Sequence, residues 1–477
     1  MSKSYLIKPP LSIFKEYDIQ SQISEDLNEN TYYTLGVAIG SELQEMYGLH
    51  TLLLCRDSRA SSEAFSEALI KGLLLSGTHI IDIGCLPTPV LYFAMQSLQC
   101  LSGLIITASH NPADHNGLKI ILGGHNYYGQ RLRTLHQRID SEQFVADNQG
   151  RAMLIRYPSE QIISKYIQTI KNNMEHIKKL RVVVDCGNAV AGYVAPQLLS
   201  ELGCEVIPLY CDVQSTFINH NPDPSIPGNL TDLSQVVLEH HADLGIALDG
   251  DGDRIGIVDN KGDIIPADYL LLAFADALLK KQSDSVVVCD VKCTQHLHEY
   301  IAARNGRAIM TKTGTANIMA SMIEHQAAIG GEFCGHFYFR DRWIHYDDGL
   351  YAAARTLEML SGQSHDMHSL FKRFPASVST NELRIAIDDR LKEEFMKQLL
   401  VQAPLHIQGE LTHLDGLKVN LANAWGLIRP SNTGPYLTLR FEAKSMQALH
   451  DIKLLFARLI NAVNPLLELP FLINESD

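Results

Sequence analysis

The feature that most constrains this chain of 477 residues is a unit that occurs three times along it. Each copy opens with a short apolar run, and these runs are HTLLLCRD from His50, LRVVVDCGN from Leu180 and DSVVVCDVK from Asp284. In each copy a helical pattern then leads to a second apolar run. Apolar runs that alternate with helical patterns predict strand–helix–strand units, whose strands pair in parallel through right-handed crossovers.

A third apolar run in each copy ends in an unusual loop. These segments are LIITASHNP from Leu104, LGIALDGDGDR from Leu244 and AAIGGEFCGH from Ala327. In parallel α/β sheets, ligands collect beyond the carboxyl ends of the strands. We therefore predict three similar α/β domains with mixed sheets, whose loops face one central cleft.

The remaining hundred or so residues follow another pattern. The segment GLIRPSNTGPYLTLRFEA from Gly426 predicts a loop followed by an alternating strand, and the next twenty residues have helical spacing. This region predicts a smaller C-terminal α+β domain. Turn-rich stretches near Asn148–Gly150, near Asn260–Gly262 and from Ser361 predict four domains, at 1–155, 156–262, 263–372 and 373–477.

Composition excludes several classes of protein. The formal net charge of −14 disfavours nonspecific binding to nucleic acid or to an anionic membrane. No apolar run reaches the roughly 18 residues that span a bilayer, and the first residues lack a secretory leader pattern, so we expect a cytoplasmic protein. The nine cysteines contain no CxxC pair, which suggests neither a zinc site nor a disulfide framework.

The segment DGDGDR at 249–254 places three carboxylates at alternate positions. Crowded carboxylates repel one another unless a cation lies among them, and hard oxygen ligands suit Mg²⁺. An EF-hand loop is excluded, because its sixth position is Arg254 and its twelfth is Asn260. We therefore predict that Asp249, Asp251 and Asp253 bind Mg²⁺, with Arg254 placed to donate to a phosphate.

Ser109 follows a predicted core strand in TASHNP, where Pro112 prevents an immediate helix. The pattern predicts an exposed serine. A metal ion beside a serine suits phosphoryl transfer through a phosphoserine, because the cation neutralises charge that grows on the leaving oxygen. Ser109 is therefore the candidate phosphoryl carrier.

Two further loops carry weaker signals. The segment RPSNTGP contains Arg429, Ser431, Asn432 and Thr433. Short hydroxyl and amide side chains beside an arginine are suited to hold a phosphate, although an ordinary turn is the common alternative. In GGEFCGH, Glu332 and His336 lie on a glycine-rich bend. A carboxylate there is suited to accept hydrogen bonds from sugar hydroxyls, although a self-satisfied turn is again common.

TASHNP, DGDGDR, GEFCGH and RPSNTGPYLTLRFEA stand in this order along nearly the whole chain. With these motifs the sequence resembles the α-D-phosphohexomutases, in particular the bacterial phosphomannomutase/phosphoglucomutase branch. The resemblance implies a monomer with four domains around a cleft. It also implies interconversion of hexose 1-phosphate and hexose 6-phosphate, of mannose or glucose, through phosphoserine and a 1,6-bisphosphate. Mg²⁺ and glucose 1,6-bisphosphate, as activator, are the implied cofactors.

The resemblance also implies residue roles. The implied catalytic residues are Ser109, Lys119, Arg254 and His336, with the proton transfers open among Lys119, Lys292 and His336. The implied metal site is Ser109, Asp249, Asp251 and Asp253. The implied substrate contacts are Tyr17, Lys292, Glu332, Cys334, His336, Arg429, Ser431, Asn432 and Thr433.

Three positions depart from the pattern of the branch. Gln20 stands where an arginine is usual, Cys334 replaces a serine, and Thr315 replaces a histidine. A lost charged contact costs about 1–3 kcal/mol, so we expect slower turnover or a shifted sugar preference.

Three alternatives stay open from the sequence. A phosphoglucosamine mutase usually carries SGTEP where this chain has SNTGP. A weakened paralogue that only binds sugar phosphates fits the three departures, but the intact Ser109 and aspartates argue against it. A phosphatase would result if water reached phosphorylated Ser109.

Overall fold

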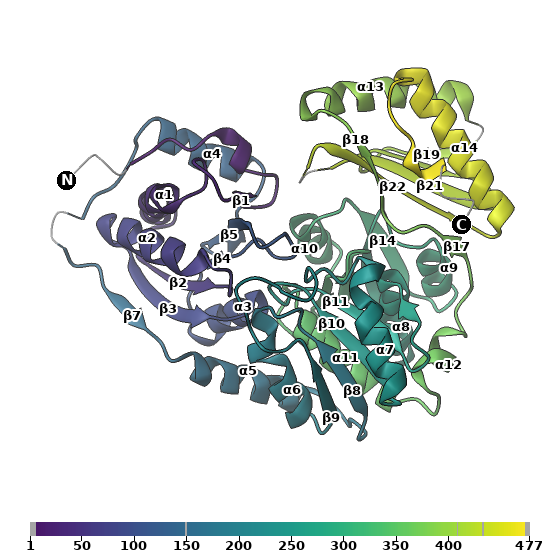
Figure 1. Ribbon diagram of the computed structural model, residues 1–477, viewed down its shortest axis with the longest axis horizontal. Coiled ribbons are helices and arrows are strands. Elements are labelled where there is room, and N and C mark those ends of the chain that lie inside the picture. The colour runs from purple at the N-terminus through teal and green to yellow at the C-terminus, as the bar shows by residue number, and fades with distance from the viewer. Residues whose placement is uncertain (1–5, 148–149, 408, 432–433, 473–477) are drawn as a thin grey trace.

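The computed structural model describes residues 6–147, 150–407, 409–431 and 434–472. The chain folds into three α/β units followed by a smaller fourth unit (Figure 1). The fourth unit packs beside the third and lies across from the first (Figure 1). Within the described residues, no helix is long and apolar enough to cross a membrane.

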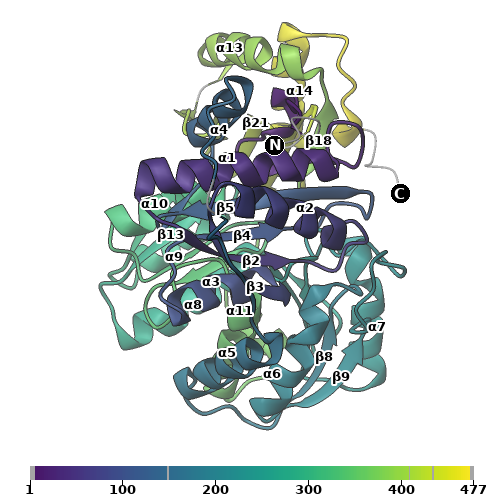
Figure 2. The ribbon, with the colours of Figure 1, turned by 90° about the vertical axis from the view of Figure 1, so that its left-hand side faces the viewer.

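The first unit contains a seven-stranded sheet in the order β1-β5-β4-β2-β3-β7, with β6 paired to β5. Its strands are β1 (Ile19–Gln22), β2 (Thr51–Arg56), β3 (His79–Cys85), β4 (Gly103–Ile106), β5 (His115–Leu122), β6 (His125–Asn126) and β7 (Leu154–Arg156). Its helices are α1 (Glu29–Tyr47), α2 (Ser62–Leu75), α3 (Thr88–Ser97) and α4 (Gln130–Asp140). Helices α1 and α2 cover one face of the sheet and α3 covers the other (Figure 2).

The second and third units have five-stranded and four-stranded sheets. The second comprises α5 (Ser159–Asn173), β8 (Arg181–Asp185), α6 (Ala195–Glu201), β9 (Glu205–Leu209), α7 (Thr231–Glu239), β10 (Leu244–Leu248), β11 (Ile255–Asp259) and β12 (Ile264–Ile265). The third comprises α8 (Ala267–Lys281), β13 (Val286–Asp290), α9 (His296–Ala302), β14 (Arg307–Thr311), α10 (Thr315–Glu324), β15 (Ile329–Gly331), β16 (Phe337–Phe339), α11 (Gly349–Ser361) and α12 (Met367–Phe371).

The predicted repeat is confirmed in the sheet topology. In each unit the first strand of the repeat (β2, β8 or β13) has parallel neighbours on both sides. The third strand of the repeat (β4, β10 or β15) then pairs antiparallel with a fourth (β5, β11 or β16). Because the loops TASHNP, DGDGDR and GEFCGH connect these third and fourth strands, they occupy equivalent places in the three units.

The fourth unit is an antiparallel sheet covered by two helices. It comprises β17 (Val378–Ser379), β18 (Leu383–Ala386), α13 (Asp389–His406), β19 (Glu410–Thr412), β20 (Leu417–Asn420), β21 (Ala424–Pro430), β22 (Tyr436–Ala443) and α14 (Met446–Val463). The loop predicted from Gly426 was wrong at its start, because Gly426–Pro430 is part of β21. The alternating pattern predicted for β22 was also wrong, since residues 437–443 are all buried.

The burial of β22 follows from a polar interface with the third unit. Arg440 pairs with Asp268 at 2.9 Å and donates to the backbone oxygen of Lys292. Lys418 Nζ donates to the backbone oxygen of Val291 at 2.9 Å. Polar side chains of the fourth sheet are therefore buried because they hold the backbone next to Lys292, a predicted substrate contact.

Candidate active site

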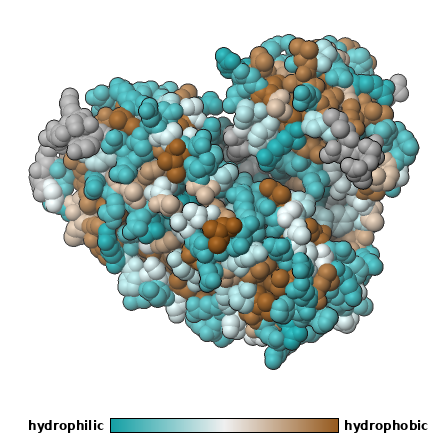
Figure 3. All heavy atoms as spheres, viewed as in Figure 1, coloured by the Kyte–Doolittle hydropathy of each residue, from teal (hydrophilic) through white to brown (hydrophobic). Residues whose placement is uncertain are grey.

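A cavity of about 590 Å³ lies where the four units meet. Figure 3 shows the surface hollowed between the first and fourth units. Eleven of the residues predicted from the sequence line it: Tyr17, Ser109, Lys119, Asp253, Arg254, Lys292, Glu332, Cys334, His336, Arg429 and Ser431. The predicted common cleft is therefore present, and it gathers residues that are more than 400 positions apart in the chain.

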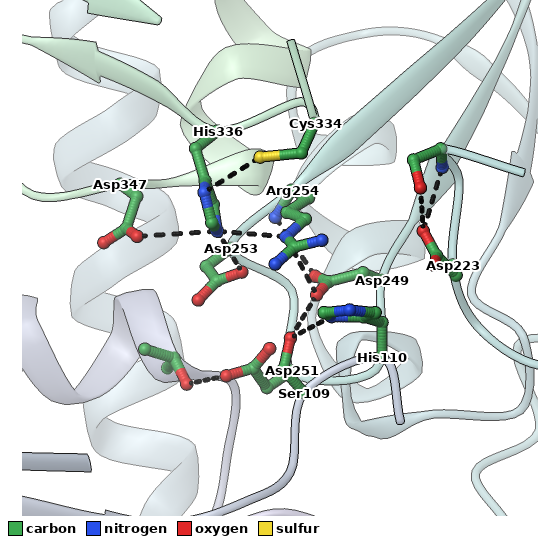
Figure 4. Close-up of polar contacts among 12 residues, drawn as sticks. Ser109, His110, Asp223, Asp249, Asp251, Asp253, Arg254, Cys334, His336 and Asp347 are labelled. Carbon is green, nitrogen blue, oxygen red and sulfur yellow. Dashed lines mark hydrogen bonds and ion pairs between the residues drawn. The ribbon is translucent and has the colours of Figure 1, made fainter. Parts of the chain in front are cut away.

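Ser109 opens onto this cavity from the loop after β4. Its backbone has a positive φ of 49°, a conformation rare for a residue other than glycine, and its Oγ donates to Asp249 Oδ2 at 2.8 Å (Figure 4). The prediction of an exposed serine was wrong, because only 7% of Ser109 is exposed. The carboxylate loop of the second unit covers the serine and leaves it facing the cavity.

Arg59, which sequence reasoning missed, holds the backbone of the serine loop. This buried side chain pairs with Asp57 at 3.1 Å. Its guanidinium donates to four backbone oxygens, those of Ser109 (2.7 Å), Asn111 (2.6 Å), Pro112 (2.5 Å) and His115 (3.0 Å). A planar group with five donors suits such a loop, but the sequence shows only an arginine after a strand.

The DGDGDR loop joins β10 to β11, and its three carboxylates are fully buried. Gly250 is required there, because a Cβ at this position would lie 2.2 Å from the backbone oxygen of Ser109. Lys119 Nζ lies 2.7 Å from Asp251 Oδ2 and 2.5 Å from Asp253 Oδ2. The ammonium group of Lys119 therefore bridges two of the predicted metal ligands.

The electrostatics of this loop indicate a place for a cation. Burial, Asp253 and Asp251 raise the pKa of Asp249 well above its ordinary value. Burial opposes the charge of Asp253 too, but Lys119 and His336 hold the pKa of that carboxyl well below its ordinary value. Asp251 Oδ1 is buried without a hydrogen-bond partner among the described residues. An unpaired oxygen among hard carboxylate donors fits Mg²⁺.

His336 connects the DGDGDR loop to the GEFCGH bend (Figure 4). Its Nδ1 lies 2.9 Å from Glu332 Oε2 and its Nε2 lies 3.2 Å from Asp253 Oδ1. Burial lowers the pKa of the imidazole, but Cys334 and Asp253 outweigh it and raise this pKa well above its ordinary value. A charged ring carries a proton on both nitrogens and donates to both carboxylates. Arg254 Nε lies 3.1 Å from His336 Nε2, and because both atoms are then donors, this pair is a close contact and not a hydrogen bond.

The far side of the cavity is lined by cations and by tyrosine. Lys292 Nζ donates to Glu382 Oε2 at 3.0 Å, and Arg429 Nε donates to Asp415 Oδ2 at 2.9 Å. The hydroxyl of Tyr17 donates to the backbone oxygen of Thr313 at 2.8 Å. Asn432 and Thr433 lie outside the described residues.

Gln20 and Thr315, two of the three positions that depart from the motif pattern, both make hydrogen bonds within the protein. Gln20 Nε2 donates to the backbone oxygen of Ala108 at 3.3 Å and so supports the serine loop. Thr315 Oγ1 donates to Asp347 Oδ2 at 3.0 Å. Asp347 is a buried cavity residue that sequence reasoning missed, although two adjacent aspartates before a helix were a visible signal. Asp348 caps α11, which leaves Asp347 facing the cavity.

Known families match this chain along almost its full length. Four models match in order: phosphoglucomutase/phosphomannomutase alpha/beta/alpha domain I at residues 11–146, domain II at 164–262, domain III at 266–378 and the C-terminal domain at 382–459.

Individual proteins agree with these matches. A phosphomannomutase/phosphoglucomutase of Pseudomonas aeruginosa is 41% identical over 462 residues, which cover 97% of this chain and 98% of that protein. A phosphoglucosamine mutase of Methanocaldococcus jannaschii is 31% identical over 431 residues, 88% of this chain and 92% of that protein. A crystal structure of a phosphoglucomutase/phosphomannomutase family protein from Burkholderia thailandensis superimposes with a TM-score of 0.89 at 36% identity, covering 97% of this chain and all of that one.

Proposed function

The chain belongs to the phosphoglucomutase/phosphomannomutase family and interconverts hexose 1-phosphates and hexose 6-phosphates, and we propose that Ser109 carries the transferred phosphoryl group. The observation that carries the proposal is the position of Ser109 Oγ, 2.8 Å from Asp249 and facing a cavity that residues of all four units line. This position lets one serine meet either end of a sugar phosphate bound across the cavity.

The phosphoryl group is transferred in two successive displacements at phosphorus. The free hydroxyl of the substrate attacks phosphorylated Ser109, the bond between phosphorus and Ser109 Oγ breaks, and a hexose 1,6-bisphosphate forms. After the sugar reorients, Ser109 Oγ attacks the other phosphoryl group, the bond between that phosphorus and the sugar oxygen breaks, and the hexose monophosphate leaves. In each displacement the attacking hydroxyl loses a proton and the leaving oxygen gains one. Lys119, Lys292 and His336 are the candidates to hold or move the hydroxyl proton, and Lys119 already lies beside the carboxylate loop.

We propose that Asp249, Asp251 and Asp253 hold Mg²⁺ together with an oxygen on Ser109. When bound, the ion supplies Lewis acidity that neutralises charge on the phosphoryl oxygens. The carboxylates fix the loop against Ser109, and Asp251 Oδ1 offers an unpaired ligand atom. A chain that lacks its phosphoryl group would be primed by glucose 1,6-bisphosphate.

Substrate recognition is proposed for the far side of the cavity. Arg429 and Ser431, with Asn432 and Thr433, would hold the phosphate that is not transferred, and Arg254 and Lys292 would add positive charge. Tyr17, Glu332, Cys334 and His336 would contact the sugar. These groups come from different units, which suits a site that must accept the sugar in two orientations.

Mannose and glucose are the proposed sugars. The phosphomannomutase/phosphoglucomutase relative is 41% identical and the phosphoglucosamine mutase relative 31%, and the loop reads SNTGP. Gln20 and Thr315 each make a hydrogen bond within the protein, and this supports a working site over a decayed one.

The test is a mutase assay with Mg²⁺ and trace glucose 1,6-bisphosphate. Mannose 1-phosphate, glucose 1-phosphate and glucosamine 1-phosphate would be compared side by side. We expect turnover of the first two and little of the third. A folded protein that turns over none of them would favour the alternative of a sugar-phosphate binding paralogue.

A further inference from the structure

The bend between β15 and β16 presents an oxygen, a sulfur and a nitrogen donor at one wall of the cavity. His336 Nδ1 lies 2.9 Å from Glu332 Oε2 and 3.4 Å from Cys334 Sγ. All three donor atoms lie within 4.8 Å of one another. Glu332 and His336 are buried, Cys334 is partly exposed, and all three line the cavity.

These separations suit a tetrahedral zinc ion. Bonds of about 2.0–2.1 Å to nitrogen and about 2.3 Å to sulfur place two tetrahedral ligands roughly 3.5 Å apart. The separation between Cys334 Sγ and His336 Nδ1 is 3.4 Å. Gly335 has a positive φ of 97° and allows the bend to turn so tightly that residues two apart direct their donors to one point.

The second contacts of these residues would orient them as ligands. Glu332 Oε1 accepts from the backbone N–H of Gly314 at 2.6 Å, which fixes the carboxylate and leaves Oε2 toward the other two donors. The opposite nitrogen of His336 faces Asp253 Oδ1 at 3.2 Å. Metal-bound histidines commonly donate their other ring N–H to a carboxylate in this way.

We propose that Glu332 Oε2, Cys334 Sγ and His336 Nδ1 form a Zn²⁺ site that is separate from the carboxylate loop. Zn²⁺ binds cysteine as the thiolate and histidine through an unprotonated nitrogen, so binding would release to water any proton on Cys334 Sγ or His336 Nδ1. Three protein ligands leave a fourth position open toward the cavity. Mg²⁺ prefers oxygen ligands, so the thiolate makes this site selective for zinc, whereas the DGDGDR loop offers oxygen alone.

The consequence for activity rests on the proposed function. Glu332, Cys334 and His336 are the proposed sugar contacts, so a zinc ion there would compete with hexose phosphate. Excess Mg²⁺ would not relieve this inhibition, because the two ions would occupy different sites.

Cobalt substitution tests the site without turnover. The protein would be stripped with chelator and given excess Mg²⁺ to fill the carboxylate loop, and then titrated with Co²⁺. We expect a near-ultraviolet thiolate-to-cobalt absorption that saturates at one equivalent and is abolished by Zn²⁺. Cys334→Ser should remove this absorption and weaken Zn²⁺ binding roughly 100-fold or more, since a lost outer partner alone costs about 10–100-fold.

Two outcomes would overturn the proposal: no thiolate absorption in the unaltered protein, or an absorption that persists in Cys334→Ser. His336→Asn should lose the absorption as well, and thermal unfolding would show that both variants are folded. Because the readout is metal binding, a negative result leaves the proposed mutase function untouched.

Discussion

The loops DGDGDR and GEFCGH occupy equivalent places in two copies of one unit, yet they present different chemistry. Each connects the third strand of its sheet to an antiparallel fourth. The first offers three buried carboxylates, and the second offers oxygen, sulfur and nitrogen. His336, the last residue of GEFCGH, joins the two loops: its Nε2 lies 3.2 Å from Asp253 and its Nδ1 lies 2.9 Å from Glu332.

This difference shows that the repeated sheet sets where the loops meet, while the loop residues set what they do there. The carboxyl ends of parallel strands place the loops at one cavity. In the carboxylate loop, Asp251 Oδ1 is buried without a hydrogen-bond partner among the described residues, which fits a bound cation. In the GEFCGH bend, by contrast, Glu332 Oε2 is already paired with His336 Nδ1 at 2.9 Å.

The largest effect is expected at Ser109, where the carboxylate loop meets TASHNP, the equivalent loop of the first unit. Ser109→Ala removes the oxygen that we propose carries the phosphoryl group, and we expect mutase activity to fall by roughly 10⁴-fold or more. Steady-state kinetics with glucose 1-phosphate would measure this loss, with circular dichroism as the folding control. Substantial activity in a folded variant would rule out Ser109 as the carrier.

A pair of matched variants compares the two loops directly. Asp251→Asn removes the charge beside the unpaired oxygen, and we expect kcat to fall about 10²–10³-fold, as for the loss of a group that stabilises the transition state. Its dependence on added Mg²⁺ should also move to higher concentration. Glu332→Gln should instead act mainly on KM and leave the Mg²⁺ dependence in place; equal shifts in both variants would contradict the division between the loops.

Arg59 tests whether the backbone of the serine loop must be held in place. Arg59→Lys keeps the charge but loses most of the four backbone contacts, and we expect kcat to fall roughly 10–100-fold with KM nearly unchanged, because small displacements of a reacting group are costly. Arg138→Lys is the control, since Arg138 is also buried and pairs with Glu42 at 2.7 Å in the same unit. A loss of kcat as large in the control would show that stability, not loop position, is responsible.

The smallest effect is expected at Cys334. Cys334→Ser introduces a hydroxyl that can bond a sugar hydroxyl. A neutral hydrogen bond is worth about 1 kcal/mol, so we expect KM to fall by about fivefold. Measured KM values for mannose and glucose phosphates would test this. A higher KM for both would mean that the thiol is the better sugar contact.

The repeat, the fold class and the clustering of motif loops were predictable from sequence, because apolar runs and loop residues are local signals. Mixed sheets were predicted, but the sequence did not show which strands run antiparallel, since β5, β11 and β16 follow the motif loops and carry no signal of their own direction. The interior of β22 was misjudged because its polar residues are buried against another unit. Arg59 was missed because only its tertiary contacts show what it does, and Asp347 was missed although the pair of aspartates before α11 was visible in the sequence.

The most direct test of the central proposal is to follow the phosphoryl group on Ser109. The purified protein would be treated with glucose 1,6-bisphosphate, freed of excess ligand, and analysed by peptide mass spectrometry before and after addition of mannose 1-phosphate. We predict phosphate on Ser109 before addition, and its transfer to the sugar as a bisphosphate afterwards. Turnover by a protein whose Ser109 never carries phosphate would contradict the account.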